Sequence, residues 1–261
     1  MSPEVFSPTL YPYVNEVLKL FRDEAQATLG EYFLGMYLHG SLALGDFTPG
    51  HSDIDFVVVT TAEPPESITP ALEAMHQRIH DGGLAWAGKL EGAYFPVSSI
   101  YRFNTEEPPR PHVWNRKFFT ARPESDWLIN FHILREHGVT VAGPPIRPLI
   151  MPITPDDIKR AVVEGLRVDW APRLDDRAWL TPPGNQPFVV LTNCRSLYTL
   201  KYGTVKSKPA AAGWALKTLG KRWQGLIKDA MTWHQGMPPG DIEATLAMMK
   251  YTWDRAKACK L

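Results

Sequence analysis

Apolar and polar positions follow a helical period at the start of the chain. Between Pro12 and Leu29 apolar side chains recur every three or four residues, and Gly30 comes directly after the last of them. This spacing predicts a helix that buries one face and ends at Gly30. A second helix is expected from Glu66 to His80, where Asp81-Gly82-Gly83 would stop it.

Short apolar runs between these two helices predict strands. One run covers Leu34 to Leu38, and a second, rich in β-branched residues, covers Phe56 to Val59. Both have the length of a buried strand and end at turn-forming residues. A third strand is expected over 89–97, where Glu91 interrupts the apolar character. The chain therefore begins as a helix, strand, turn, strand and helix, which is typical of an α/β (α+β) domain with a mixed sheet.

The second half of the chain has a helical pattern throughout. The basic, proline-punctuated stretch 106–123, which carries Trp114, predicts a surface loop, and a helix is expected over 124–137. Residues 143–152 are rich in proline and predict a linker. Further helices are expected at 155–170, 188–202, 209–219, 222–235 and 241–258, the first of them capped by Thr154 with Pro155 next. The sequence thus predicts a first domain over 1–150 and an all-α bundle over 151–261.

Composition and charge narrow the class of partner. The 261 residues are 44% apolar, and 28 basic side chains balance 28 acidic ones. A protein that binds nucleic acid usually carries a positive field, so a small-molecule partner is favoured and no nucleic acid is expected. Cys194 and Cys259 have no ligand-like spacing. Without a long apolar span or a signal peptide, we expect a cytoplasmic protein with no membrane contact, and a monomer.

Two acidic residues open the second strand. Asp53 and Asp55 are two positions apart, so in an extended chain they project from the same face with Cα atoms about 6–7 Å apart. Two carboxylates this close repel each other, and a divalent cation such as Mg²⁺, which prefers oxygen ligands, relieves the repulsion. The alternative is an ordinary strand with two acids at its exposed end.

A Gly-Ser pair lies upstream of the two acids. Gly40 lets backbone N–H groups approach a phosphate, and Ser41 adds a hydroxyl donor at a helix start. Gly-Ser, a spacer and then Asp-Ile-Asp between apolar residues resembles the signature of the DNA polymerase β-like nucleotidyltransferase superfamily. In that superfamily a third carboxylate from a neighbouring strand faces the pair as a metal ligand or a base. The resemblance implies Glu91 for this role.

Other readings of nearby residues remain open. Glu91 could be an edge-strand charge that pairs with Lys89, and Asp46, in the spacer, is a weaker rival that more simply turns the loop. His76 and His80 are four apart on the second expected helix, a spacing that can bind metal, but no third ligand is evident near them.

The helical second domain makes the resemblance to a particular family more specific. The stretch Val190 to Tyr198, Lys206-Ser207-Lys208 and Ala210 to Ala215 resemble the C-terminal domain of the aminoglycoside 3″- and 9-adenylyltransferases. Those enzymes bind ATP and the drug between a nucleotidyltransferase domain and a helical domain. Carried over by position, the resemblance implies the following roles: phosphate at Gly40 and Ser41, Mg²⁺ at Asp53, Asp55 and Glu91, the general base at Glu91, and the triphosphate at Arg195 and Lys208. The alternative for the two basic residues is a surface helix charge.

The loop before the Val190 helix departs from the family. Members that modify streptomycin have acidic residues and a tryptophan there, whereas residues 180–188 of this chain contribute amides and prolines. With neutral partners in the loop, a polycationic drug would lose charge-assisted hydrogen bonds, each of which is worth about 1.5–3 kcal/mol. Asp169, Asp175 and Asp176 lie slightly upstream and are candidates to replace them.

The sequence therefore predicts Mg²⁺-dependent transfer of AMP from ATP to a hydroxyl of a small molecule. The expected acceptor is a polycationic aminoglycoside or aminocyclitol antibiotic. Two alternatives stay open: a nucleotidyltransferase acting on another metabolite or a protein, and an inactive nucleotide-binding regulator. Retention of Asp53, Asp55 and Glu91 together disfavours the inactive regulator, because three repelling carboxylates would serve no purpose in it.

Overall fold

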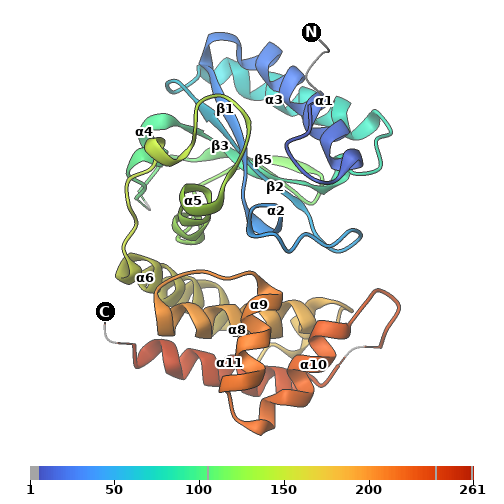
Figure 1. The fold of residues 1–261 in the computed structure, drawn as a ribbon, viewed down its shortest axis with the longest axis vertical. Helices are drawn as coiled ribbons and strands as arrows, with labels where there is room; N and C mark the ends of the chain where they lie inside the picture. The colour runs from blue at the N-terminus through green and yellow to red at the C-terminus, as the bar shows by residue number, and fades with distance from the viewer. Residues whose placement is uncertain (1–5, 105, 239, 260) are drawn as a thin grey trace. The chain divides into compact units, whose positions relative to one another are not determined.

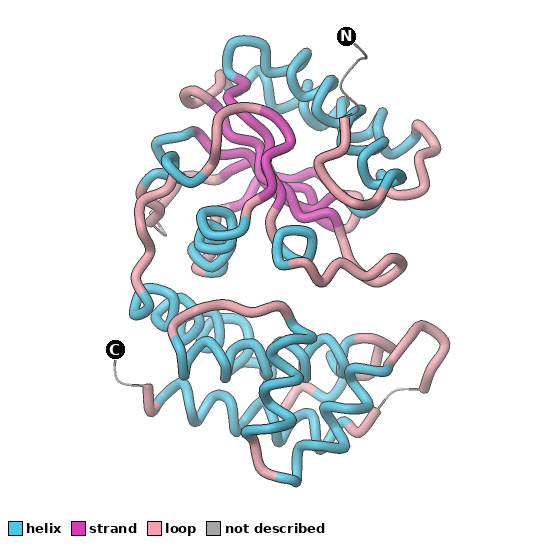
Figure 2. The backbone as a smooth tube through the Cα atoms, viewed as in Figure 1, coloured by secondary structure: helices cyan, strands magenta, loops and turns pink. Residues whose placement is uncertain are grey.

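The computed structural model describes residues 6–104, 106–238, 240–259 and 261, and the chain divides into two compact units, Met1–Pro152 and Ile153–Leu261. Within the described ranges, every strand lies in the first unit, and the second is built from helices and turns (Figure 2). The fold class predicted from the sequence, a mixed sheet with helices followed by a helical region, is confirmed. No helix in these ranges is long and apolar enough to cross a membrane.

The first unit is organised around a six-stranded mixed sheet with the order β5-β4-β3-β2-β1-β6. β2 and β3 run parallel, and the other neighbouring strands pair antiparallel. The strands are β1 (Phe33–Leu38), β2 (Ile54–Thr60), β3 (Leu90–Pro96), β4 (Arg110–Trp114), β5 (Lys117–Ala121) and β6 (Val139–Ala142). The three expected strands are present as β1, β2 and β3.

Helices cover both faces of this sheet (Figure 1). α1 (Pro12–Leu29) and α3 (Thr69–Asp81) lie on one side and α5 (Asp126–His137) on the other. Neighbouring residues of β3 make the two contacts: the Tyr94 hydroxyl lies 2.7 Å from Nε2 of His76 on α3, while the Phe95 ring packs against Phe131 of α5. The predicted helix over 12–29 is confirmed with its bounds, and its apolar stripe is buried.

The stretch 106–123 is not the loop that its prolines suggested. It forms the β4–β5 hairpin at one edge of the sheet. The prediction was wrong because Pro111 does not interrupt a ladder: β4 pairs with β3 only at His112 and Val113. The missing N–H of Pro111 therefore breaks no bond to β3.

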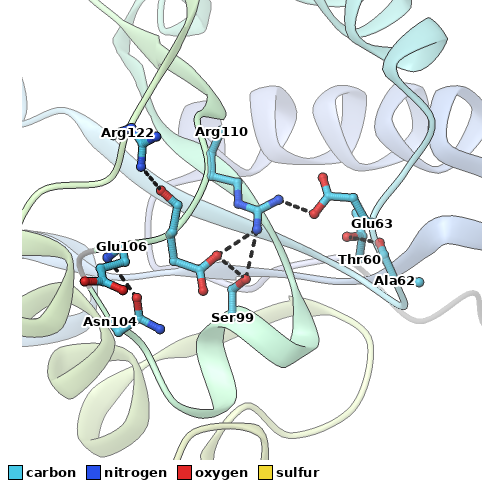
Figure 3. A network of polar contacts seen from close by, with 9 residues as sticks. Thr60, Ala62, Glu63, Ser99, Asn104, Glu106, Arg110 and Arg122 are labelled. Atoms are coloured by element: carbon cyan, nitrogen blue, oxygen red, sulfur yellow. Dashed lines mark hydrogen bonds and ion pairs between the residues drawn. The ribbon is translucent and has the colours of Figure 1, made fainter.

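A buried arginine fixes the foot of this hairpin (Figure 3). Arg110, 4% exposed, pairs with Glu63 and donates to Glu107 Oε2 (2.7 Å) and to Ser99 Oγ (3.1 Å). Ser99 also donates to Glu107 at 2.6 Å. A buried arginine held by a carboxylate and a hydroxyl at once has little freedom to move.

Short helical elements connect the strands of the first unit: η1 (Gly30–Tyr32), α2 (Gly40–Leu44), η2 (Glu66–Ile68), η3 (Ala87–Lys89), α4 (Val97–Tyr101) and η4 (Arg147–Leu149). Of these, α4 was not expected from the sequence, and neither was the strand β6.

The second unit packs around α8 (Asn185–Tyr202), which is buried on several sides. The helices around it are α6 (Pro155–Gly165), α7 (Arg177–Leu180), α9 (Lys208–Thr218), α10 (Gln224–Thr232) and α11 (Ile242–Lys257), with short turns η5 (Leu166–Trp170), η6 (Ala171–Arg173) and η7 (Lys221–Trp223). The five expected helices are confirmed, and so is the cap: Thr154 Oγ1 accepts the Asp157 N–H at 3.2 Å. The first of these helices ends at Gly165 rather than 170, where the chain continues as a π-helical turn.

Candidate active site

The turn after β1 brings Gly40 against Asp55. Gly40 has a φ of +58°, which L side chains rarely adopt, and a Cβ built on it would lie 2.6 Å from Asp55 Cγ and overlap the Oδ2 oxygen. The His39 N–H also donates to the Asp55 carbonyl at 3.0 Å. Glycine at position 40 is therefore what allows the β1–α2 turn to lie directly on the carboxylate.

Ser41 has an unused hydroxyl. Among the described residues its Oγ is buried and has no hydrogen-bond partner, although its carbonyl accepts the Asp46 N–H at 3.0 Å. A buried polar group without a partner costs about 1–3 kcal/mol, so an oxygen-rich ligand such as a phosphate would be favoured at Ser41. Through this hydrogen bond the backbone of Asp46 closes the turn after α2.

Asp55 and Glu91 stand side by side on neighbouring parallel strands. They are register partners in the β2–β3 ladder, and residues paired in this way project from the same face of a sheet. Asp53 lies just before β2, where Lys89 Nζ donates to its Oδ1 at 3.0 Å. The lysine that was a possible partner of Glu91 therefore pairs with Asp53.

The surroundings of Glu91 favour its protonated form. Burial, together with the negative charges of Asp53 and Asp55, raises the pKa of Glu91 to about 7, against the smaller opposing effects of the Asn115 backbone and Lys89. A carboxylate with a pKa close to the working pH is well suited to accept a proton from a hydroxyl and release it again.

The carboxylates fit a divalent cation that also binds a ligand. Mg²⁺ takes oxygen donors, and it commonly uses one or two protein carboxylates and completes its shell with water and substrate phosphates. Over the described ranges no three His, Cys, Asp or Glu side chains form a ready group of metal ligands. Asp53, Asp55 and Glu91 therefore stay the predicted ligands, with phosphates of a bound nucleotide completing the shell. His76, buried and bonded to Tyr94, belongs to the core.

Arg195 and Lys208 belong to the second unit. Arg195 lies within α8, and Lys208 is the first residue of α9, behind the cap Ser207. The Lys208 ammonium lies 4.2 Å from the centroid of the Phe188 ring. The structure thus divides the predicted site residues into five that meet around β2 and β3 of the first unit and two on helices of the second.

The upstream acids of the second unit have structural partners. Asp175 pairs with Lys250 at 2.7 Å, and Asp176 caps α7 by accepting the Trp179 N–H at 3.0 Å. The carbonyl of Asp169 accepts a bond from Arg173. Asp175 and Asp176 thus use their carboxylates within the fold, whereas the bond to Asp169 involves only its backbone carbonyl, so a drug-binding role for these acids stays a prediction.

The amides of that loop are also engaged in the fold. Asn185 Nδ2 donates to the Trp179 carbonyl at 2.7 Å, and Gln186 Nε2 donates to the Leu180 carbonyl at 3.1 Å. Because α8 begins at Asn185, these two bonds tie the first turn of that helix to the residues before it, Trp179 and Leu180.

A cavity of about 690 Å³ lies away from the carboxylates. It is lined by the distal end of β2 and β3, including Thr60 and Tyr94, and by Arg110 at the hairpin foot. Thr60 is five positions along the strand from Asp55, which is about 17 Å. None of the predicted site residues lines this cavity, so its size alone does not identify it as the active site.

The tip of the β4–β5 hairpin was not predicted from the sequence. The β3–β4 register, in which Gly92 pairs with Val113, brings the turn at Asn115 and Arg116 close to Glu91, and the neighbouring Trp114 is 60% exposed. A weak signal was present, because Asn115 favours the first position of a two-residue hairpin turn, although Arg116 and Lys117 follow it rather than Gly and an apolar residue. The prolines of 106–123 outweighed it.

Comparison with known proteins adds two family matches. A model of the nucleotidyltransferase domain matches residues 18–134, and a model of the aminoglycoside adenylyltransferase C-terminal domain matches residues 149–256. The two matched ranges follow each other along the chain in the order of the two compact units.

Proteins named as adenylyltransferases are similar to this chain over most of its length. An aminoglycoside (3″)(9) adenylyltransferase from Klebsiella pneumoniae is 28% identical over 230 residues, covering 83% of this chain and 82% of the relative. A spectinomycin 9-adenylyltransferase from Campylobacter jejuni is 26% identical over 231 residues, with the same coverage of 83% and 82%. A spectinomycin adenyltransferase from Enterococcus faecialis, solved with ATP and spectinomycin, has a TM-score of 0.72 at 18% identity and covers 93% of this chain and 98% of its own. The last similarity establishes the fold.

Proposed function

The chain belongs to the nucleotidyltransferases that carry an aminoglycoside adenylyltransferase C-terminal domain, and from this premise we propose that it transfers AMP from ATP to a hydroxyl of an aminoglycoside or aminocyclitol. The observation that carries the proposal is the meeting of Gly40, Asp55 and Glu91 at one end of β2 and β3. The names of the relatives supply the acceptor class.

The proposed roles follow from the contacts of each residue. Gly40 and the unpartnered Ser41 hydroxyl bind phosphate oxygens, and Asp53 and Asp55 hold Mg²⁺. The metal, when bound, neutralises charge on the phosphates during the displacement. Glu91 accepts the proton of the attacking hydroxyl, for which its raised pKa suits it.

We further propose that Arg195 and Lys208 bind the triphosphate. An ammonium or guanidinium on a phosphate forms a charge-assisted hydrogen bond, and two of them would offset much of the nucleotide charge. The balanced net charge of the chain favours a small-molecule acceptor over nucleic acid, and a monomer in the cytoplasm is the simplest setting for a detoxifying enzyme.

The loop over 180–188 favours an acceptor with few positive charges within this class. It offers amides and prolines rather than carboxylates, and since the NH2 groups of Asn185 and Gln186 donate to backbone carbonyls, only their neutral amide oxygens remain to face a cation. A strongly cationic drug such as streptomycin would lose charge-assisted bonds here, whereas spectinomycin would lose less.

An acceptor panel tests the proposal. Purified protein with MgATP should release pyrophosphate when spectinomycin is added, at least ten times faster than with streptomycin. Pyrophosphate release with a different metabolite or a protein instead would favour the alternative acceptor. Nucleotide binding without release for any acceptor would favour an inactive regulator.

A further inference from the structure

A basic side chain lies among the acids at this end of β2 and β3. Lys89 Nζ donates to Asp53 Oδ1 at 3.0 Å, and the two side chains are 41% and 35% exposed. Asp53 directly precedes β2 and Lys89 directly precedes β3, and the first residues of these strands, Ile54 and Leu90, are register partners. Lys89 therefore lies opposite Asp53, one step before the first pair of this parallel ladder.

Two cross-strand pairs of charged residues follow each other here, and they differ in sign. Asp55 has the like charge of Glu91 as its register partner, whereas Asp53 contacts the opposite charge of Lys89. Like charges opposite each other destabilise a sheet, and opposite charges stabilise it. The Lys89 ammonium thus supplies a positive charge to a group of three carboxylates.

The backbone that carries Lys89 is tied to the core. The Lys89 N–H donates to the Trp86 carbonyl at 3.0 Å and closes η3. The Trp86 ring stacks on Tyr13 of α1, with ring centroids 5.0 Å apart, and packs against Phe47 with centroids 5.5 Å apart. The ammonium is therefore presented to Asp53 from a fixed backbone, although its four-carbon stem can still turn away.

We propose that Lys89 is a counter-ion of the carboxylate site, which neutralises Asp53 and competes with a divalent cation for it, so that the cation binds tightly only together with nucleotide phosphates. The inference rests on the proposed function, in which Asp53 and Asp55 hold Mg²⁺. A lysine ammonium and Mg²⁺ both need the oxygens of Asp53, and two cations at close range repel each other. Phosphates add negative charge and further oxygen ligands, which offset this repulsion.

Binding of a divalent cation without nucleotide tests this role, with Mn²⁺ as the probe and calorimetry as the measurement. Lys89→Met removes the charge and keeps an unbranched side chain, so the affinity for Mn²⁺ should rise about ten-fold over wild type. Lys89→Arg keeps the charge and should bind Mn²⁺ within about two-fold of wild type. Lys19→Met removes an exposed lysine of α1 with the same change in net charge, and it should leave the affinity unchanged.

The sign of the change separates competition from simple support. If Lys89 only held Asp53 in place, Lys89→Met would bind Mn²⁺ more weakly than wild type, so an affinity equal to or below that of wild type would overturn the inference. With a non-hydrolysable ATP analogue bound, the gap between the two proteins should shrink, and a gap that stayed the same would also overturn it. Absence of AMP transfer by the wild-type protein with every acceptor, with the Mn²⁺ results as expected, would refute the proposed function alone.

Discussion

Two features of the backbone and surroundings at position 40 require glycine. Its φ is positive, and the space a side chain would need is filled by the Asp55 carboxylate. Gly40→Ala should therefore destabilise the protein by about 2–4 kcal/mol, from backbone strain plus steric overlap, and should abolish adenylyl transfer by displacing Asp55. Thermal melts and a turnover assay check both effects.

Gly45 offers a matched control. Its φ is +75°, but a Cβ there would meet nothing within 4 Å. Gly45→Ala should cost only the strain, about 1 kcal/mol, and should keep turnover. Equal activity in the two variants would mean that the contact between Gly40 and Asp55 has no role in catalysis.

Glu91 should make the metal-free protein less stable as the pH rises. Its pKa is about 7 in the fold and near 4.5 when unfolded, so between these values the native state holds a proton that the unfolded state has lost. Stability from this group is complete below pH 4.5, falls up to pH 7 and stays low above it. Glu91→Gln should gain about 1 kcal/mol over wild type above pH 7, after discounting for partial exposure, and nothing at pH 4.5.

Melts in EDTA across this pH range measure the effect, and EDTA removes any cation that would itself favour the ionised form. A stability difference between Glu91→Gln and wild type that stayed constant from pH 4.5 to 8 would contradict the raised pKa.

At the level of residues, the contacts that the sequence pattern predicted are those within one short stretch of the chain. Gly40, Asp53 and Asp55 lie within one short stretch, so their proximity is a matter of turn and strand geometry. The β4–β5 hairpin, whose tip the register brings close to Glu91, lies in a proline-rich stretch and was not predicted. Strand pairing between segments this far apart is a tertiary property that periodicity does not encode.

At the level of elements, the helices with a complete signal were the ones predicted well. α1 has an apolar stripe and a terminal glycine, and α6 has its Thr154 cap. β6 and α4 are four and five residues long, too short for a period to show. For α6 the expected end was too late, because the π-helical turn after Gly165 keeps the same apolar pattern.

The contact of α3 with β3 should make the protein sensitive to acid. His76 is 1% exposed, and burial chiefly lowers its pKa to about 3. Below the ordinary value of 6.5 the unfolded histidine takes up a proton that the native one refuses, so stability falls as the pH drops. His76→Gln should shrink the stability loss between pH 7 and pH 5 by about 1–2 kcal/mol.

Denaturant unfolding at the two pH values measures this loss, and the exposed His51→Gln serves as the control, which should leave it unchanged. A loss in His76→Gln equal to that of wild type would mean that another group, such as the buried His39, accounts for the acid sensitivity.

At the level of the whole molecule, the proposal for Lys208 makes nucleotide affinity depend on the second unit. Lys208→Ala should weaken MgATP by about 1.5–3 kcal/mol, the range for a charged hydrogen bond. It should weaken the acceptor only through the missing nucleotide, because reciprocal coupling links the two ligands. Calorimetry with a non-hydrolysable ATP analogue, with and without acceptor, separates these effects.

Lys217 is the control for this measurement, because it is an exposed lysine near the end of the same helix, α9. Lys217→Ala should leave MgATP affinity unchanged. If Lys208→Ala behaves like Lys217→Ala, Lys208 is a surface charge. If the acceptor binds equally well without nucleotide, the proposed coupling between nucleotide and acceptor is wrong.

The transfer of AMP itself is tested most directly by following the two ends of ATP. With spectinomycin and Mg²⁺, label at the α-phosphate should move to the acceptor, and label at the γ-phosphate should leave in pyrophosphate. Asp55→Asn should abolish both, since the proposed metal ligand is lost. Label from the γ-phosphate on the acceptor, or transfer undiminished in Asp55→Asn, would contradict adenylyl transfer at this site.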